Sequence, residues 1–259
     1  MKILKTVVYY ELSNVLRSKW LYVLTILIAI MTFTFLFLSD DIKKTLLSLT
    51  IVFCALIPLV ALLFTSLYWY NSERFTELLL TQPISRKVIF LSRAVILGTS
   101  LIFSLSIGVV IPFAWFQIFN ADILFFLGLM SLLALVFVNL GLLISVSMSD
   151  KMKALGLVLG IWMYLLMVHD GIVLMGLLLL KGYPTDISAL VAGTINPIGL
   201  ARILLIRYFD QPLLLSFTGA RVQLFLSSTT GVIAALIGGA IWIFCPLWLG
   251  LRAFIRRDY

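Results

Sequence analysis

The sequence predicts an all-α, polytopic membrane protein with six transmembrane helices. Hydrophobic residues make up 63% of the 259 residues and charged residues only 12%, a composition that excludes a soluble globular domain. The apolar residues fall into six long runs, and about 20 consecutive apolar residues let a helix cross the hydrocarbon core of a bilayer. We therefore expect residues 1–259 to form a single transmembrane domain.

The six predicted spans follow one another along the chain. Their approximate bounds are Trp20–Ser39, Leu46–Tyr70, Val88–Phe119, Ile123–Met148, Ala154–Leu180 and Leu224–Leu249. The second and third contain Pro58 and Pro112, which a helix in lipid accommodates with a kink. The third is longer than a bilayer requires, so it must tilt, kink or project from the surface. Cys54 and Cys245 are predicted to be buried thiols, although spans that meet could pair them.

Two polar segments have the pattern of amphipathic helices. Residues 1–19 place apolar side chains at helical spacing between charged ones, which predicts an interfacial helix on the cytoplasmic side. Residues 71–87 predict a second such helix, followed by a turn at Pro83 and basic residues. Its apolar face would lie on lipid and its charged face would be open to a soluble partner. The alternative is a positively charged loop that only orients the protein.

The longest connection, residues 181–222, is too interrupted by prolines and charges to be a span. Asn196–Pro197 predicts a helix start, with Asn as the N-cap and Pro at the first helical position. Gly199–Tyr208 should continue as a short helix.

Basic residues indicate the orientation of the chain in the membrane. Thirteen lysines and arginines fall on the side that carries residues 71–87 and both termini, and six fall on the other side. Because cytoplasmic segments are enriched in basic residues, we expect both termini in the cytoplasm and residues 181–222 outside. The membrane surface, rather than nucleic acid, explains the net charge of +8.

Asp170 is an acidic residue within the fifth apolar run, and His169 stands beside it. A charge inside a membrane is costly, so a functional role is the default hypothesis for Asp170. Met163 and Met167 precede it on a similar helix face, and methionine and histidine are ligands of soft, copper-type sites. Because methionine in an apolar helix usually serves packing, we favour a structural or gating hydrogen bond at Asp170 over a metal site formed by Met163, Met167 and His169.

The sequence lacks the motifs of the common ATP-driven and hydrolytic sites. It contains no G-x-x-x-x-G-K-[ST] phosphate loop, no G-x-S-x-G and no H-E-x-x-H, and it has a single histidine. We therefore expect neither catalysis nor a bound cofactor in this chain. Uphill transport would draw its energy from another chain or from an ion gradient.

Two motifs carry a resemblance to a known family. The run E-R-x-x-E-L-L-L-x-x-P-I-S-R at Glu73–Arg86 resembles the cytoplasmic coupling helix of ABC-2 type permeases, also called type V exporters. Within that family the chain is similar to NosY-type permeases, which serve maturation of nitrous oxide reductase. The further support is Asp170 in the fifth span and N-P-x-x-L-x-R-I-L at Asn196–Leu204 before the last span.

The resemblance implies partners and a location. Two copies would form the membrane part of a complex in the bacterial inner membrane, with a separate NosF-like ATPase that holds ATP and Mg²⁺. A NosD-like periplasmic β-helix protein would bind the outer face, and the complex would assist assembly of a copper site. The residues assigned to ATPase coupling are Glu73, Arg74, Glu77, Leu78, Pro83 and Arg86. Those assigned to docking of the outer partner are Asn196, Pro197, Arg202 and Arg207.

Within this assignment, Glu73 and Glu77 share a helix face that would meet the ATPase. Leu78, Leu79 and the turn at Pro83 would hold the helix against the membrane and the adjoining spans. Three other readings stay open: an ABC-2 permease for another cargo, an ion-coupled carrier that uses Asp170, and an intramembrane enzyme. Ion-coupled carriers often contain internal repeats, and the sequence shows no convincing repeat of spans 1–3 in spans 4–6. An intramembrane enzyme would need more than one His–Asp pair facing a cavity.

Overall fold

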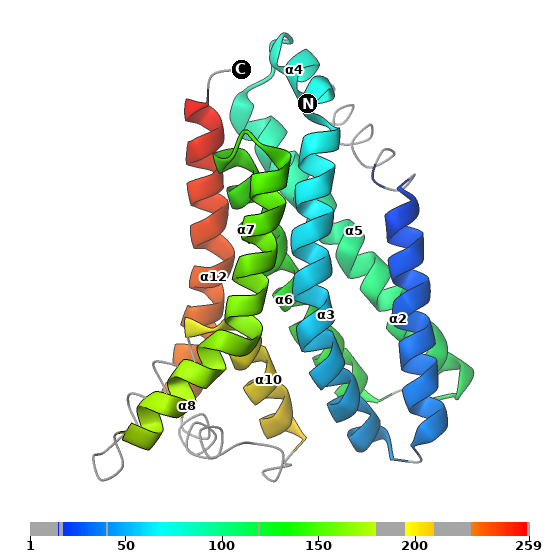
Figure 1. Cartoon of the computed structure of the whole chain (residues 1–259). Helices are drawn as coiled ribbons and strands as arrows, with labels where there is room; N and C mark the ends of the chain where they lie inside the picture. Colours follow the sequence, from blue (N-terminus) through cyan, green and yellow to red (C-terminus); the bar gives the residue numbers. More distant parts are fainter. Residues whose placement is uncertain are drawn as a thin grey trace.

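The computed structural model describes residues 15, 18–39, 41–118, 120–179, 195–209 and 229–257, and its regular elements in these ranges are helices (Figure 1). They are α2 (Lys19–Leu38), α3 (Ile42–Asn71), α4 (Glu73–Leu80), α5 (Arg86–Trp115), α6 (Ala121–Ser147), α7 (Lys151–Met163), the π-helical turn Tyr164–Val168, α8 (His169–Leu179), α10 (Pro197–Tyr208) and α12 (Thr229–Arg256).

Six of the described helical segments are long and apolar enough to cross a membrane. They are Lys19–Leu38, Ile42–Asn71, Arg86–Trp115, Ala121–Ser147, Lys151–Val173 and Leu236–Arg256. This confirms the predicted all-α, polytopic fold with six spans. Pro58 and Pro112 both lie inside continuous helices, as expected of prolines in lipid.

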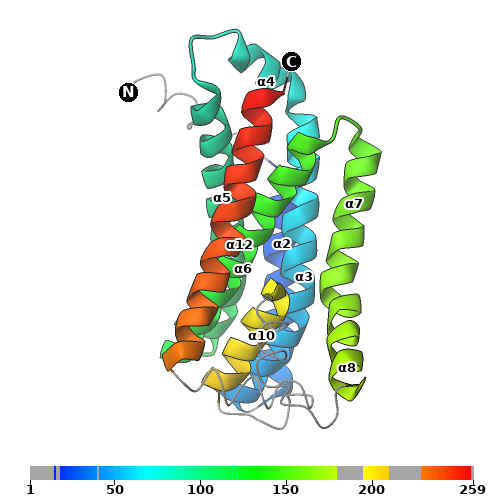
Figure 2. The same cartoon turned by 90° about the vertical axis from the view of Figure 1, so that its left-hand side faces the viewer.

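The long helices run side by side and alternate in direction (Figures 1 and 2). The end of the bundle that carries α4, called here the α4 end, also carries the α6–α7 connection and the last turn of α12. The opposite end, called the α10 end, carries α10 and the α2–α3 and α5–α6 connections. At the α10 end the Tyr208 ring stacks on Phe125 at a centroid distance of 4.0 Å. A hydrogen bond with the Asp122 carboxylate raises the pKa of Tyr208 and fixes α10 to the start of α6.

The centre of the bundle is α6, which packs on α3, α5 and α12, while α2 packs mainly on α5. Small residues allow these helices to approach closely. Gly141 of α6 faces Thr65 of α3, and Gly108 of α5 faces Ile28 of α2. Helix α2 contacts α3 through far fewer residues than it contacts α5, and these two helices are separated along part of their length.

Side chains at the helix starts satisfy backbone N–H groups. Asp41 accepts from the backbone N–H of Lys43 at 2.9 Å, and Asp150 accepts from that of Met152 at 2.8 Å. Asn196 accepts from the N–H of Ile198 at 3.0 Å, which confirms its predicted role as N-cap of the short helix.

Several predicted boundaries differ from the observed ones for local reasons. The amphipathic helix predicted over residues 71–87 is shorter, because Asn71 still belongs to α3 and Arg86 already belongs to α5. The third span ends at Trp115 rather than Phe119. Gln117 takes a left-handed conformation with φ 56°, and the N–H of Ile118 donates to the Phe113 carbonyl in a Schellman-type ending.

The last span continues to Arg256, seven residues beyond the predicted end at Leu249. Its predicted start, at Leu224, lies outside the described residues. Cys54 is buried as expected, but Cys245 is exposed, so the prediction of a buried thiol was wrong there. Of the predicted interfacial helix over residues 1–19 only three residues are described, and most of the connection 181–222 also lies outside the described ranges.

The contact between α2 and α5 generates a stability prediction. A Cβ atom at Gly108 would lie 2.6 Å from Cγ2 of Ile28 and 3.1 Å from the Thr25 carbonyl oxygen, so Gly108→Ala forces the helices apart. Overpacking of this kind costs about 1–3 kcal/mol, and we expect a lower melting temperature for the purified protein in detergent. Gly128→Ala on α6 is the control, because its Cβ would meet nothing within 4 Å. Equal melting temperatures for the two variants would contradict the packing described.

Candidate functional site

Helix α4 is a short amphipathic helix that crosses the α4 end between α3 and α5 (Figure 1). The chain turns into it at Ser72, whose hydroxyl donates to the Tyr68 carbonyl oxygen at 2.7 Å. The buried face of α4 carries Thr76 and Leu79. The opposite face is exposed and carries Arg74, Glu77 and Leu78.

Arg93 of α5 holds the buried face of α4. Its side chain is only 1% exposed, and its Nη1 atom donates to the Thr76 hydroxyl at 3.0 Å. The guanidinium carbon also lies 5.0 Å from the centroid of the Trp69 ring and 5.8 Å from that of Tyr68. A cation over an aromatic face is attracted by the ring quadrupole, most strongly where water is excluded. One buried side chain thus joins α3, α4 and α5.

The aromatic residues around Arg93 extend the contact to the last span. Phe254 of α12 is fully buried, and its ring meets Trp69 edge-on at a centroid distance of 5.6 Å. It also lies 5.8 Å from the ring of Phe90, on α5. The final turns of α12 therefore pack against the same residues that hold α4.

Two arginines neutralise the C-terminal ends of neighbouring helices. Arg86 Nη1 donates to the carbonyl oxygens of Ile255 at 3.0 Å and Arg257 at 2.8 Å, at the end of α12. Arg257 Nη1 donates to those of Val146 at 2.9 Å and Met148 at 3.3 Å, in the last turn of α6 and just after it. Helix C-termini leave carbonyl groups without intrahelical partners and carry partial negative charge, so a cation satisfies both requirements.

The same network reaches α4 through Glu73. Its carboxylate lies 3.8 Å from Nη2 of Arg257. From α3, the Tyr70 hydroxyl donates to the carbonyl oxygen of Met148 at 3.0 Å and more weakly to that of Ser145 at 3.3 Å. The ends of α3, α4, α5, α6 and α12 are thus one connected assembly. We call its five polar members the α4 anchor: Tyr70, Glu73, Arg86, Arg93 and Arg257.

The structure divides the predicted coupling residues into two groups. Glu73 and Arg86 belong to the α4 anchor and bind within the chain. Arg74, Glu77, Leu78 and Pro83 are exposed. Glu73 and Glu77 therefore have different surroundings, although they were predicted to share one face. Of Leu78 and Leu79, which were both predicted to hold the helix, Leu79 packs against the spans, whereas Leu78 is 64% exposed.

A second polar cluster lies at the α10 end and consists of His169, Asp170, Asn196 and Arg202. The Asp170 carboxylate accepts from the guanidinium of Arg202 and, at 3.4 Å, from the side-chain amide of Asn196. The same amide donates to the Leu165 carbonyl oxygen at 2.6 Å, within the π-helical turn. Arg202 thus supplies the countercharge to Asp170, and Asn196 joins the start of α10 to the fifth span.

Asp170 lies within the fifth apolar helix, close to the end that is farther from Lys151. It follows Lys151 by nineteen residues, which is about 28 Å at the helical rise of 1.5 Å per residue. The hydrocarbon core is about 30 Å thick, so Asp170 lies near the far end of its span. Its charge is tolerated because it is partly exposed there and paired with Arg202.

The proposed soft metal ligands are not brought together. Met163 and Met167 are 51% and 65% exposed, whereas His169 is 7% exposed, with Nδ1 3.4 Å from the Asn196 amide. Within the described ranges, no group of three His, Cys, Asp or Glu side chains could hold a metal ion. The geometry therefore gives no support to a metal site at this cluster.

The residues predicted to dock an outer partner have mainly internal roles. Asn196 and Pro197 are buried at the start of α10, because one caps the helix and the other begins it. Arg202 is half-exposed and bound to Asp170. The side chain of Arg207 lies outside the described part of the structure.

Comparisons with known proteins agree with this arrangement. No protein-family model matches the chain. Two curated relatives match it over nearly their whole length, and both are named probable ABC transporter permease protein NosY. The relative from Pseudomonas aeruginosa is 26% identical, over 96% of this chain and 94% of its own. The relative from Stutzerimonas stutzeri is 28% identical, over 95% and 93%. The chain is thus similar over nearly its whole length to proteins named as ABC transporter permeases of the NosY type.

The two relatives confirm the resemblance predicted from the two motifs. Most of the α4 anchor was not predicted from the sequence. The protein buries Arg93 within a span, seven residues after α5 begins. A basic residue so far inside an apolar helix is itself a signal, because it requires a buried partner. Tyr70 and Arg257 gave no comparable signal, since aromatic and basic residues at span ends are common.

The role of Arg93 generates a prediction about the attachment of α4. Arg93→Met keeps an unbranched side chain but removes the hydrogen bond to Thr76 and the contact with Trp69, together worth about 2 kcal/mol or more. In a permease freed of Cys54 and Cys245, a cysteine in place of Leu79 should react with a maleimide at least tenfold faster in the Arg93→Met background. The control is Arg74→Met, on the exposed face of α4. Equal labelling rates in both backgrounds would show that Arg93 does not hold α4.

The cluster at the α10 end generates a charge-exchange prediction. Asp170→Arg places two cations together and should lower the melting temperature of the permease, and Arg202→Asp should do the same with two carboxylates. The double variant restores opposite charges, so we expect it to recover part of the loss. A double variant no more stable than the sum of the two single changes would argue against direct pairing.

Proposed function

We propose that this permease works as a homodimer with a separate ATPase chain, and that α4 is the helix on which the ATPase docks. The supporting observation is that α4 is exposed on one face and held on the other by contacts with α3, α5 and the end of α12. A partner bound to Arg74, Glu77 and Leu78 would act on an element that cannot move independently of the spans.

The long helices offer a route for motion between the two ends. Helix α3 runs for 30 residues from the α10 end to Asn71, about 45 Å at 1.5 Å per residue. It contacts α10 as well as α4. A tilt imposed on α4 would therefore be carried as a rigid-body movement to α10 and its attached cluster.

The finer proposal is that the complex serves assembly of the copper site of nitrous oxide reductase. The support is that both curated relatives bear the name NosY. In this proposal the α4 end faces the cytoplasm of a bacterium with the permease in its inner membrane. Both termini lie on the cytoplasmic side, and a periplasmic β-helix protein docks at the α10 end. ATP and Mg²⁺ would be held by the ATPase, since the permease sequence has no phosphate loop.

The distribution of charge supports this orientation. The α4 end gathers exposed or partly exposed basic side chains that fit the cytoplasmic side of a membrane. They are Arg74, Arg86, Lys87, Lys151, Lys153, Arg252 and Arg256.

The alternative of an ion-coupled carrier finds less support. A coupling carboxylate must exchange a proton or a cation during transport, but Asp170 already has Arg202 as its countercharge. An ABC permease for another cargo would use the same α4 contacts, because docking of the ATPase does not depend on what is transported.

Charge reversal on the exposed face of α4 tests the function proposed. Glu77→Lys combined with Leu78→Glu should leave the permease folded in the membrane but remove the ATPase from the purified complex and abolish its ATP hydrolysis. Loss of one partner of an interfacial charge pair costs about 2–5 kcal/mol, which is enough to detach a subunit.

Lys44→Glu is the matched control, because it reverses one exposed charge at the α10 end. It should leave co-purification unchanged. If the α4 variant retains the ATPase and couples hydrolysis as the parent does, α4 is not the docking helix.

A further inference from the structure

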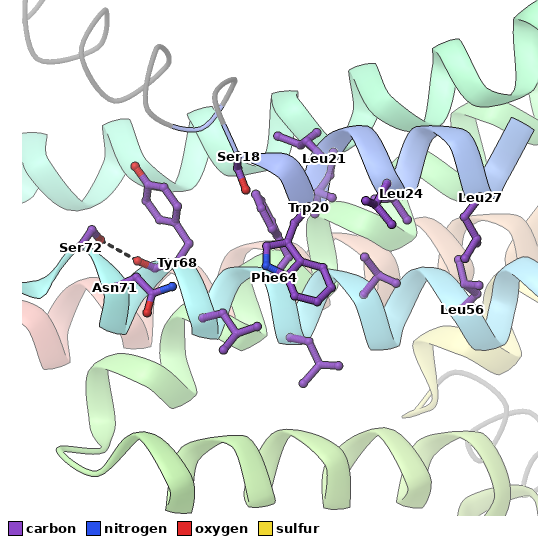
Figure 3. Close-up of a pocket in the computed structure, with 15 residues that line it drawn as sticks. Ser18, Trp20, Leu21, Leu24, Leu27, Leu56, Phe64, Tyr68, Asn71 and Ser72 are labelled. Atoms are coloured by element: carbon purple, nitrogen blue, oxygen red, sulfur yellow. Dashed lines mark hydrogen bonds between the residues drawn. The ribbon is translucent and has the colours of Figure 1, made fainter.

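A groove lies between α2 and α3 in the half of the bundle next to the α4 end (Figure 3). Its volume is about 460 Å³, and Leu101 of α5 forms part of its floor. Figure 3 shows Leu24 and Leu27 of α2 facing Leu56 and Phe64 of α3 across it. The groove exists because α2 packs on α5 and diverges from α3.

The length of the groove corresponds to one leaflet of a bilayer together with its headgroup region. Its lining on α3 begins at Leu56 and ends at Ser72, sixteen residues later, a distance of about 24 Å at the helical rise. One leaflet accounts for about 15 Å of hydrocarbon and for about 20 Å when its headgroup region is included, so an acyl chain and its headgroup together can extend along the groove. The aliphatic side chains that line the groove along this length suit an extended acyl chain.

The polarity of the lining changes along the groove. Its middle is formed by leucine, valine and phenylalanine side chains, but its end at the α4 end is formed by Ser18, Asn71 and Ser72. Lys151 of α7 lies at this end, with Nζ donating to the Asn71 side-chain oxygen at 3.2 Å. Lys19 is exposed beside Ser18, and Trp20 reaches over the groove toward α3 (Figure 3). A tryptophan at this level is typical of the membrane–water interface.

We propose that this groove binds an anionic phospholipid, with an acyl chain between α2 and α3 and the phosphate at Lys19, Asn71 and Lys151. The apolar length fits the chain, and the two lysines supply the charge that an anionic headgroup requires. The Asn71 amide N–H groups can donate to a phosphate or ester oxygen, because the side-chain oxygen already accepts from Lys151. This site is independent of the ATPase proposed to dock on α4.

The headgroup contacts predict a measurable preference. Each lysine near a membrane surface contributes about 1 kcal/mol of attraction to anionic lipid, which is roughly fivefold in affinity. Two lysines should therefore make phosphatidylglycerol bind about 25-fold more tightly than phosphatidylcholine of the same chain length. The experiment is native mass spectrometry of the purified permease, titrated with each lipid in detergent and with both in competition.

Two sets of variants separate the headgroup from the chain. Lys19→Gln with Lys151→Gln should reduce the ratio of phosphatidylglycerol affinity to phosphatidylcholine affinity to near one. It should leave the affinity for phosphatidylcholine unchanged. Val60→Trp fills the groove and should reduce the binding of both lipids at least tenfold. Lys43→Gln with Lys44→Gln, two exposed lysines at the α10 end, is the matched control and should keep the preference of the parent.

Three results would overturn the proposal. The first is a parent protein that binds both lipids equally, and the second is a control pair that loses as much preference as Lys19→Gln with Lys151→Gln. The third is binding of glycerol phosphate, which has no acyl chain, as tightly as phosphatidylglycerol. The lysine variants decide the matter even if Val60→Trp fails to fold, because they change only exposed side chains.

Discussion

The arrangement at the α4 end depends on one buried cation. The guanidinium of Arg93 lies among apolar and aromatic side chains, where an isolated charge would be very costly. It is retained because the Thr76 hydroxyl accepts one of its N–H groups and the rings of Trp69 and Tyr68 lie under it. These partners come from the end of α3 and from α4, so the requirement to satisfy this charge fixes both elements to α5.

The remaining contacts at this end follow from the chemistry of helix termini. Three long helices finish close together there, and each leaves carbonyl groups without intrahelical donors. Arg86 and Arg257 supply the donors at α12 and α6, so one helix cannot shift without breaking hydrogen bonds to the next. A surface ion pair such as Glu73–Arg257 adds little energy by itself. Its value lies in extending a connected network to α4.

Sequence patterns predicted what depends on local chemistry. Long apolar runs gave the six spans, amphipathic spacing gave α4, and Asn196–Pro197 gave the start of α10. What failed depends on contacts between distant parts of the chain. Nothing near Arg202 indicates that Asp170 will bind it, and nothing near Arg93 indicates Trp69. Apolar spans are uniform on all faces, so their periodicity does not reveal which side meets a neighbour.

The π-helical turn Tyr164–Val168 has a consequence for how the fifth span can vary. A π turn accommodates one more residue than an α turn, and each residue of an α-helix rotates the following ones by about 100°. The extra residue is absorbed by the wider turn, so α8 keeps nearly the azimuth of an uninterrupted helix that is one residue shorter, and Asp170 faces Arg202 of α10. A one-residue deletion within this turn would therefore convert it to an α turn and leave the acid directed toward its arginine. The same deletion in the regular turns of α7 would rotate Asp170 by about 100° away from Arg202, so the fifth span tolerates a change of length within the π turn but not before it.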